Sequence, residues 1–200
     1  MIKINVILGT SRPAARGRNL FNYFRLQQEQ FEQQFKVNLN LIELSELHLP
    51  FFYEDEPPLG NQNRTLPPNE AQWVNQMAAA DGYLILTPEY NHSFPAVLKN
   101  ALDFLGEEPR GKATKVITYA DNARGGQWAF NALLPVLTRM NFFVLPHLTS
   151  IAKVATHWQP DGKWQPDDPK QAVFEHRIST AVQEAAFYTK LLADHPFSSN

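Results

Sequence analysis

The segment from Gly9 to Asn19 gathers groups that could bind an anion. Thr10 and Ser11 supply hydroxyl groups, and Arg12 and Arg16 supply guanidinium groups. The segment leads into a run with helical periodicity, and the free amides and dipole at a helix N-terminus favour negative charge. We therefore expect a phosphate to bind here. Neither GxxxxGK[ST] nor GxGxxG is present, so neither a nucleoside triphosphate nor a standard Rossmann cofactor site is indicated.

A second polar loop, Glu89 to His92, follows an apolar run. Residues 83–87 (YLILT) are typical of a strand buried on both faces of a parallel sheet, and Pro88 ends it by removing a backbone donor. Ser93 is placed to cap the following helix, whose first turn tolerates Pro95. The apolar face of that helix is predicted to consist of Leu98, Ala101, Leu102 and Leu105.

A third loop, residues 121–126 (DNARGG), separates a strand over residues 115–120 from a helix over 127–140. All three polar loops thus come directly after a predicted strand and before a predicted helix. In open α/β sheets, ligands bind at the carboxyl ends of the strands. We therefore expect the three loops to meet in one site.

The hydrophobic pattern predicts five strands that alternate with helices, in a three-layer α/β/α doubly wound parallel sheet. We expect the flavodoxin-like strand order 2-1-3-4-5, because it brings the loops after strands one, three and four together. The pairing of residues 147–156 is left unassigned. The predicted strands span residues 2–8, 37–44, 83–87, 115–120 and 141–145, and the helices span 16–35, 69–80, 93–105, 127–140 and 169–193.

Length and charge narrow the class of protein. The 200 residues suffice for a single domain, residues 1–200, and the net charge of −2 argues against nucleic acid as a partner. The absence of cysteine excludes disulfides and thiolate chemistry, and the histidines show no metal-ligand spacing. The chain enters a strand directly and shows no apolar run long enough for a bilayer, so we expect a cytoplasmic protein without membrane contact.

Three motifs, each after a predicted strand, point to one family. Residues 9–13 read GTSRP, the stretch Pro88 to Asp103 matches PEYNxSxPxxLKNAxD at every specified position, and Gly125 and Gly126 form a diglycine. In these motifs the chain resembles the NADPH-dependent FMN reductases of the flavodoxin-like superfamily, which include quinone, azo-dye and chromate reductases.

The resemblance implies how FMN would be held. Its phosphate would lie in the first loop, and its isoalloxazine would lie between the second loop and a wall formed by residues Tyr119 to Gly126. The implied cofactor-binding residues are Thr10, Ser11, Arg12, Arg16, Gly17, Pro88, Glu89, Tyr90, Asn91, Tyr119, Gly125 and Gly126. No protein residue need act as a catalytic base, since NADPH or NADH reduces the flavin, which then reduces a small-molecule acceptor in a ping-pong scheme.

The first loop departs from the family pattern. Many members carry serine where this chain has Ala15 and asparagine where it has Gly17, so two phosphate donors are missing. We hypothesise that Arg16 and Arg18 replace them.

Two other functions stay open, namely a flavin-binding electron carrier or regulatory module without reductase turnover, and a protein-interaction domain on the same scaffold. The irregular, proline-rich connection over residues 45–68 carries the aromatic run Phe51 to Tyr53. Connections of this length are usually functional or contact a partner. Since family members commonly dimerise, we expect a homodimer or a dimer-based oligomer with a contact at this run. Trp128 is assigned to an interface or to the site, and His92 to the site or to solvent.

Overall fold

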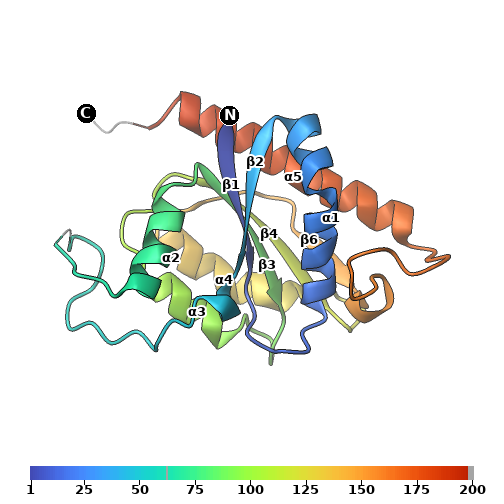
Figure 1. Ribbon diagram of the computed structural model, residues 1–200, viewed down its shortest axis with the longest axis horizontal. Helices are drawn as coiled ribbons and strands as arrows, with labels where there is room; N and C mark the ends of the chain where they lie inside the picture. The colour runs from blue at the N-terminus through green and yellow to red at the C-terminus, as the bar shows by residue number, and fades with distance from the viewer. Residues whose placement is uncertain (62, 198–200) are drawn as a thin grey trace.

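The computed structural model describes residues 1–61 and 63–197 (Figure 1). Gln62, within the predicted long connection, and residues 198–200, within the predicted single domain, lie outside this description. The elements follow the predicted alternation of strand and helix. They are β1 (Ile2–Leu8), α1 (Gly17–Phe35), β2 (Val37–Glu43), α2 (Pro68–Ala78), β3 (Gly82–Pro88), α3 (Ala96–Asp103), β4 (Ala113–Ala120), α4 (Gln127–Arg139), β5 (Phe143–Val144), β6 (Thr149–Ala152) and α5 (Gln171–Asp194).

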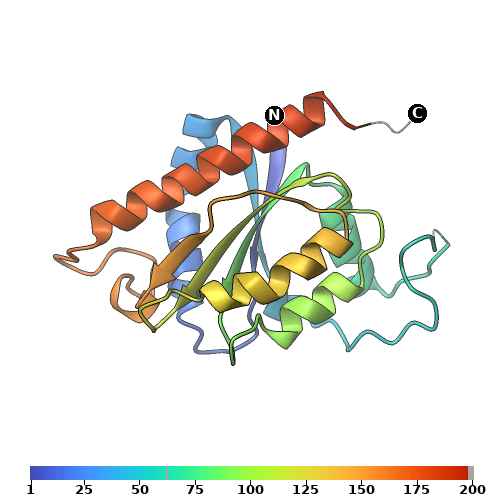
Figure 2. The same ribbon diagram turned by 180° about the vertical axis from the view of Figure 1, so that it is seen from behind.

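The strands form one parallel sheet in the order β2-β1-β3-β4-β5, which confirms the predicted topology. In the register, Leu8 at the end of β1 lies opposite Leu86 of β3, and Pro88 at the end of β3 lies opposite Tyr119 of β4. The carboxyl ends of these three strands therefore lie close together at one edge. Figures 1 and 2 show the loops after β1 and β3 at the same end of the molecule, away from the N-terminus.

The fifth position of the sheet is divided between two strands, which the sequence did not predict. β5 has only two residues and pairs with Ala113 and Thr114, whereas β6, from the unassigned segment, pairs with residues 117–120 of β4. Between the two pairings lies Lys115, which is 2% exposed. Its Nζ donates to the carbonyl oxygens of Pro146 (3.0 Å) and His147 (2.6 Å) and forms an ion pair with Glu184 of α5. The Lys115 side chain thus holds the backbone of residues 146 and 147 at the point where β4 pairs with neither β5 nor β6.

Two apolar cores cover the two faces of the sheet. On one face the sheet packs against α1 and α5 through residues such as Phe24 and Ile178. On the other face it packs against α2, α3 and α4 through residues such as Trp73, Leu102 and Leu137. Figure 2 shows α5 running across its face of the sheet. This is the expected three-layer arrangement, and none of the helices within residues 1–61 and 63–197 is long and apolar enough to cross a membrane.

Two details of the helices differ from expectation. Ser93 does not cap α3, because the helix begins three residues later with Pro95 at its N-cap and no side-chain cap. The sequence of the predicted helix over residues 169–193 places Val173 and Ile178 in one approximate apolar stripe, but Val173 is 42% exposed and Phe174 is buried instead. The buried stripe of α5 begins with Phe174 and Ile178, four residues apart, and continues to Thr189. Val173 precedes Ile178 by five residues, which does not match the helical repeat.

The connection before α5 is held by a buried histidine. Nδ1 of His157 lies 2.6 Å from Oδ2 of Asp168, and its Nε2 lies 2.9 Å from the carbonyl oxygen of Ala152. Trp164 of the same connection packs on Trp158, with ring centroids 4.6 Å apart. These contacts fix the end of β6 and the residues just after it, including Val154.

Lys115 provides a test of how the sheet edge is held. In Lys115→Met the partly buried Glu184 carboxylate and two carbonyl groups lose their donor, so the free energy of unfolding should fall by about 3 kcal/mol. Lys190→Met is the control, because Lys190 forms an exposed pair with Asp194 and its loss should cost less than about 1 kcal/mol. Urea denaturation of both variants measures the difference, and equal losses would contradict the role given to Lys115.

Candidate functional site

A cavity of about 430 Å³ opens where the loops after β1, β3 and β4 meet. Each of the three predicted loops contributes to its wall, as the sequence predicted. Its lining residues are Arg12, Ala14, Ala15, Arg16, Pro88, Glu89, Tyr90, Tyr119, Ala120, Asp121 and Val154. The contribution of Val154 was not predicted, because it depends on the pairing of β6.

In the first loop, the buried Thr10 orients Tyr90 of the second loop. The side-chain oxygens of Thr10 and Tyr90 lie 2.8 Å apart, and the guanidinium carbon of Arg12 lies 5.7 Å from the centre of the Tyr90 ring. Tyr90 is therefore held from two sides at the cavity wall. Ser11 is exposed and faces a different hollow, beside Phe51 and Ala96, so the structure does not bring it into this cavity.

The N-terminus of α1 is suited to an anion. Its N-cap residue, Arg16, makes no side-chain cap, and the first turn contains no acidic residue. For the backbone amides of Arg16 and Gly17, no acceptor occurs in the described part of the chain. The amides and the helix dipole would therefore favour a phosphate group, with the exposed side chain of Arg16 at the cavity wall.

Arg18, the second arginine of our replacement hypothesis, is already engaged elsewhere. It donates to the carbonyl oxygen of Pro13 at 3.2 Å and lies 3.1 Å from a carboxylate oxygen of the buried Glu43. Arg25 holds the other oxygen of Glu43 at 2.8 Å. Arg18 therefore stabilises a buried carboxylate, and only Arg16 of the two arginines lines the cavity.

The second loop turns sharply at Asn91 and His92, which have φ values of +49° and +62°. The Tyr90 amide donates to the Ser93 carbonyl oxygen at 2.8 Å, and the Ser93 amide donates to the Tyr90 carbonyl oxygen at 2.9 Å. Two successive residues with positive φ inside such a pair are typical of a type I′ turn, in which asparagine is favoured. Asn91 is exposed and is not among the cavity-lining residues, so here its conformation, rather than its side chain, shapes the loop.

Glu89 connects the second loop to α4. Its Oε2 accepts a hydrogen bond of 3.1 Å from the backbone amide of Trp128 in the first turn of the helix. The indole of Trp128 is 42% exposed and stacks on the His92 imidazole, with ring centres 5.7 Å apart and planes 22° apart. The structure thus brings His92 and Trp128 into contact beside the second loop. The sequence alone did not decide whether either residue belongs to the site.

Tyr119 reaches the first loop rather than the third. It is 3% exposed, and its hydroxyl lies beside Gly17, where an added Cβ would come within 2.0 Å of the oxygen. Within residues 1–61 and 63–197 this buried hydroxyl has no hydrogen-bond partner. Burial raises the pKa of Tyr119 well above its ordinary value, so the hydroxyl stays protonated and available as a donor.

Gly125 and Gly126 are required by the backbone of the sheet. Their φ values are +63° and +82°, and an added Cβ would lie 2.8 Å from backbone atoms of Ile151 and Tyr119 respectively. The carbonyl oxygen of Gly125 also accepts a 2.8 Å hydrogen bond from the Thr118 hydroxyl. Neither glycine lines the cavity. Packing against β4 and β6 therefore accounts for the diglycine, and its predicted contact with a ligand stays a prediction.

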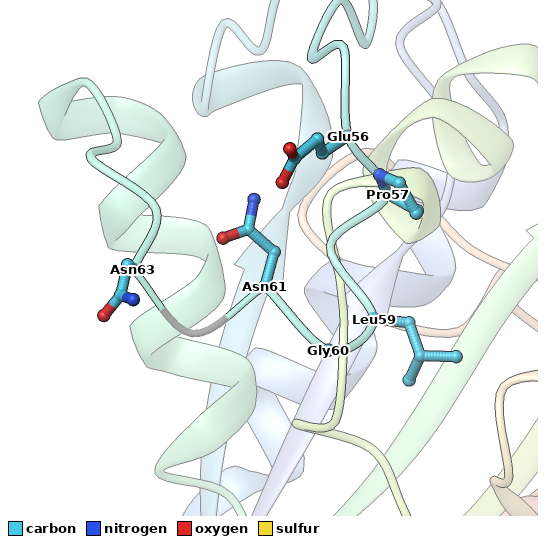
Figure 3. Close-up of a pocket in the computed structure, with 6 residues that line it drawn as sticks. All are labelled: Glu56, Pro57, Leu59, Gly60, Asn61 and Asn63. Atoms are coloured by element: carbon cyan, nitrogen blue, oxygen red, sulfur yellow. The ribbon is translucent and has the colours of Figure 1, made fainter.

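A second hollow, of about 460 Å³, lies within the long connection between β2 and α2. Figure 3 shows the residues that line it, with Leu59 pointing away from Asn61 and Asn63; the others are Glu56, Pro57 and Gly60. Its described lining residues include none of the predicted cofactor-binding residues and no lysine or arginine. No group of three or more His, Asp or Glu residues suited to a metal occurs in the described ranges. The cavity at the strand ends is therefore the better candidate for a site.

Comparison with known proteins agrees with this arrangement. A solved structure of FerB, a flavoenzyme NAD(P)H:(acceptor) oxidoreductase from Paracoccus denitrificans, is similar with a TM-score of 0.69 and 20% identity, over 96% of this chain and 98% of that one. The apo form of an NADH:FMN oxidoreductase (EMOB) is similar with a TM-score of 0.66 and 16% identity, over 98% and 92% of the two chains. At these identities the likeness establishes the flavodoxin-like fold.

Relatives in sequence carry a narrower description. An NAD(P)H-dependent FMN reductase of Schizosaccharomyces pombe is 36% identical over 78 residues, which are 38% of this chain and only 39% of that protein. One from Saccharomyces cerevisiae is 26% identical over 150 residues, or 72% and 78% of the two chains. The family model described as NADPH-dependent FMN reductase matches residues 2–156. The chain therefore belongs to the NADPH-dependent FMN reductase family of oxidoreductases.

Proposed function

We propose that the protein is an FMN-containing, NAD(P)H-dependent oxidoreductase that reduces flavins, quinones or similar small acceptors. The observation that carries the proposal is the cavity at the N-terminus of α1, whose walls combine cationic, aromatic and backbone-donor groups. The acceptor class is supported by relatives named quinone reductase, such as that of Escherichia coli, which is 33% identical over 88 residues, 42% of this chain and 47% of that protein.

The residues of the cavity fit FMN. An anion is favoured at the start of α1 by its amides and by Arg16, and the nearby Tyr119 hydroxyl is buried without a partner in the described chain. The flavin ring would lie along Pro88 to Tyr90, where Thr10 and Arg12 hold the Tyr90 ring in place. When bound, FMN would supply the redox chemistry, accepting hydride from the nicotinamide and passing electrons to the acceptor. The protein's part is to bind and orient the reactants.

Three further properties belong to this proposal. We take residues 1–200 as a single FMN-binding domain, because one sheet with a core on each face contains all the described strands. We place the protein in the cytoplasm, where NAD(P)H would be available as the reductant. The partners in the reaction are small molecules rather than nucleic acid or membrane.

Anaerobic mixing with NADPH tests turnover. The purified protein, loaded with FMN, should be yellow and should lose its visible flavin absorbance within seconds, as expected for ordinary enzyme turnover. Stopped-flow absorbance measures the rate of this loss, and subsequent addition of a quinone should restore the flavin colour. Colour that persists with both NADPH and NADH would favour the electron carrier, and failure to bind FMN would favour the interaction domain.

Arg16 tests the replacement of the missing phosphate donors. Arg16→Ala should weaken FMN binding about tenfold, which is the order of magnitude for one charge-assisted hydrogen bond. Riboflavin, which lacks the phosphate, should bind the variant as it binds the parent. Arg18→Ala is the matched control: it should lower the melting temperature, because Glu43 loses one partner, and leave FMN affinity unchanged. Fluorescence titrations that show full FMN affinity in Arg16→Ala would contradict the assignment.

We also propose that the protein is a homodimer or dimer-based oligomer that associates through Phe51 and its neighbours. Phe51 is 85% exposed and Tyr53 is 60% exposed, which is unusual for large aromatic side chains. A hollow of about 460 Å³ beside them is lined by Ser11, Phe51 and Ala96, among others. A contact here would lie directly against the first loop.

A charge at Phe51 tests the contact. Phe51→Glu should convert the dimer to a monomer, because burial of an unpaired carboxylate in an interface is costly. Phe187→Glu serves as the control, since Phe187 is 62% exposed on α5, distant in sequence from the proposed contact. Sedimentation velocity should show a dimer for the parent and for this control. A monomeric parent would contradict the proposal.

A further inference from the structure

The Tyr119 hydroxyl is a buried polar group whose position demands an explanation. Tyr119 is 3% exposed, and its oxygen has no partner in the part of the chain that the structure describes. Leaving a buried hydroxyl without a hydrogen bond is unfavourable, and such groups are few in folded proteins. The side chain also lines the cavity at the strand ends. A ligand in that cavity is therefore a natural partner for it.

The hydroxyl points at the first turn of α1. A Cβ added to Gly17 would lie 2.0 Å from this oxygen and 2.1 Å from the adjoining ring carbon. A side chain at position 17 would need the same space, so the ring from β4 and a side chain from α1 exclude each other. The polar group beside the N-terminus of α1 is thus the Tyr119 hydroxyl, which comes from β4, and not a side chain at position 17 of α1.

We propose that the Tyr119 hydroxyl donates a hydrogen bond to the phosphate of FMN at the N-terminus of α1. The inference rests on the proposed function and assigns Tyr119 to phosphate binding instead of the ring wall to which the sequence resemblance assigned it. Three kinds of donor would then converge on one anion: the backbone amides of Arg16 and Gly17, the Arg16 guanidinium and the Tyr119 hydroxyl.

The chemistry of each group agrees with this role. A phosphate dianion offers only acceptor atoms, so its binding site must supply hydrogen-bond donors. Hydrogen bonds from these donors to the charged phosphate are stronger than bonds between neutral groups. Burial keeps the hydroxyl of Tyr119 in its protonated, donating form, since it raises the pKa well above the ordinary value. The hydroxyl of Tyr90, in contrast, is already bonded to Thr10 at 2.8 Å. Tyr119 is therefore the tyrosine of the cavity whose hydroxyl has no hydrogen-bond partner among the described residues.

Tyr119→Phe removes only the oxygen and tests the proposal by flavin binding. The full chain, freed of flavin by dialysis, is titrated with FMN and with riboflavin, and bound flavin is followed by its fluorescence. FMN affinity should fall about tenfold, as for loss of one hydrogen bond to a charged group, while riboflavin affinity should stay unchanged. The melting temperature of the flavin-free variant should hold or rise, because an unpartnered buried hydroxyl has been removed.

Tyr83→Phe is the matched control. Tyr83 is also buried, at 0% exposure, but its hydroxyl donates to the carbonyl oxygen of Met77 at 2.7 Å. It lies in β3 and does not line the cavity. Removal of this oxygen should lower the melting temperature and leave the affinities for both flavins unchanged. The two variants should therefore show opposite patterns of stability and binding.

The possible outcomes separate this inference from the proposed function. Equal FMN affinity in Tyr119→Phe and the parent would overturn the inference, and so would an equal loss of affinity for FMN and riboflavin. A lower melting temperature with an unchanged ratio of the two affinities would show a purely structural hydroxyl and would also overturn it. A parent chain that binds no FMN would refute both the proposed function and the inference.

Discussion

The parallel register of β1, β3 and β4 is the constraint on which the candidate site depends. Leu8 lies opposite Leu86, and Pro88 lies opposite Tyr119, so the ends of the three strands meet at one edge. Each strand is followed by a polar loop and a helix, so a shift in register would separate the loops. Both faces of these strands are buried by helices, and the register of a strand is strongly specified where a face is buried.

Contacts between the loops then hold the site in shape without a ligand. Thr10 bonds to Tyr90 across the first two loops, Glu89 accepts from the first turn of α4, and the Tyr119 ring packs against Gly17. These contacts come from side chains whose own surroundings are fixed by strands or helix starts. Such a site is preorganised, because little conformational entropy remains to be lost when a ligand binds. Among the described residues, the buried side-chain polar atom of this set that is left without a partner is the Tyr119 hydroxyl.

The fold was predictable because local patterns determine it. The run at residues 83–87 is uncharged and rich in residues that favour strands, which is typical of a strand covered on both faces. The helix after it shows one clear apolar stripe. The two-part edge was not predictable. It depends on Lys115, whose sequence context reads as an ordinary strand residue and whose partners, the Pro146 carbonyl and Glu184, are 31 and 69 residues away.

The site was predictable in its location but less so in its details. The meeting of the three loops in one cavity follows from polar residues placed after strands, and the same residue types are the basis of the proposal that the first loop binds a phosphate. The direction in which each side chain points does not follow from residue type, because long-range packing decides it. Ser11 turns toward another hollow, Arg18 is held by Glu43, and Ser93 closes a turn instead of capping α3. Gly17 is linked to the position of Tyr119, since a side chain at position 17 would occupy the space of the Tyr119 hydroxyl.

A crystal structure of the protein grown with FMN would test the central claim most directly. The account predicts the phosphate at the N-terminus of α1, with one of its oxygens about 2.5–3.0 Å from the Tyr119 hydroxyl, the range of an O–H···O hydrogen bond. The ring should lie against Pro88 to Tyr90. A phosphate bound elsewhere, for example in the hollow beside Glu56, Asn61 and Asn63, would contradict the account, as would a Tyr119 hydroxyl that contacts only water while FMN occupies the cavity.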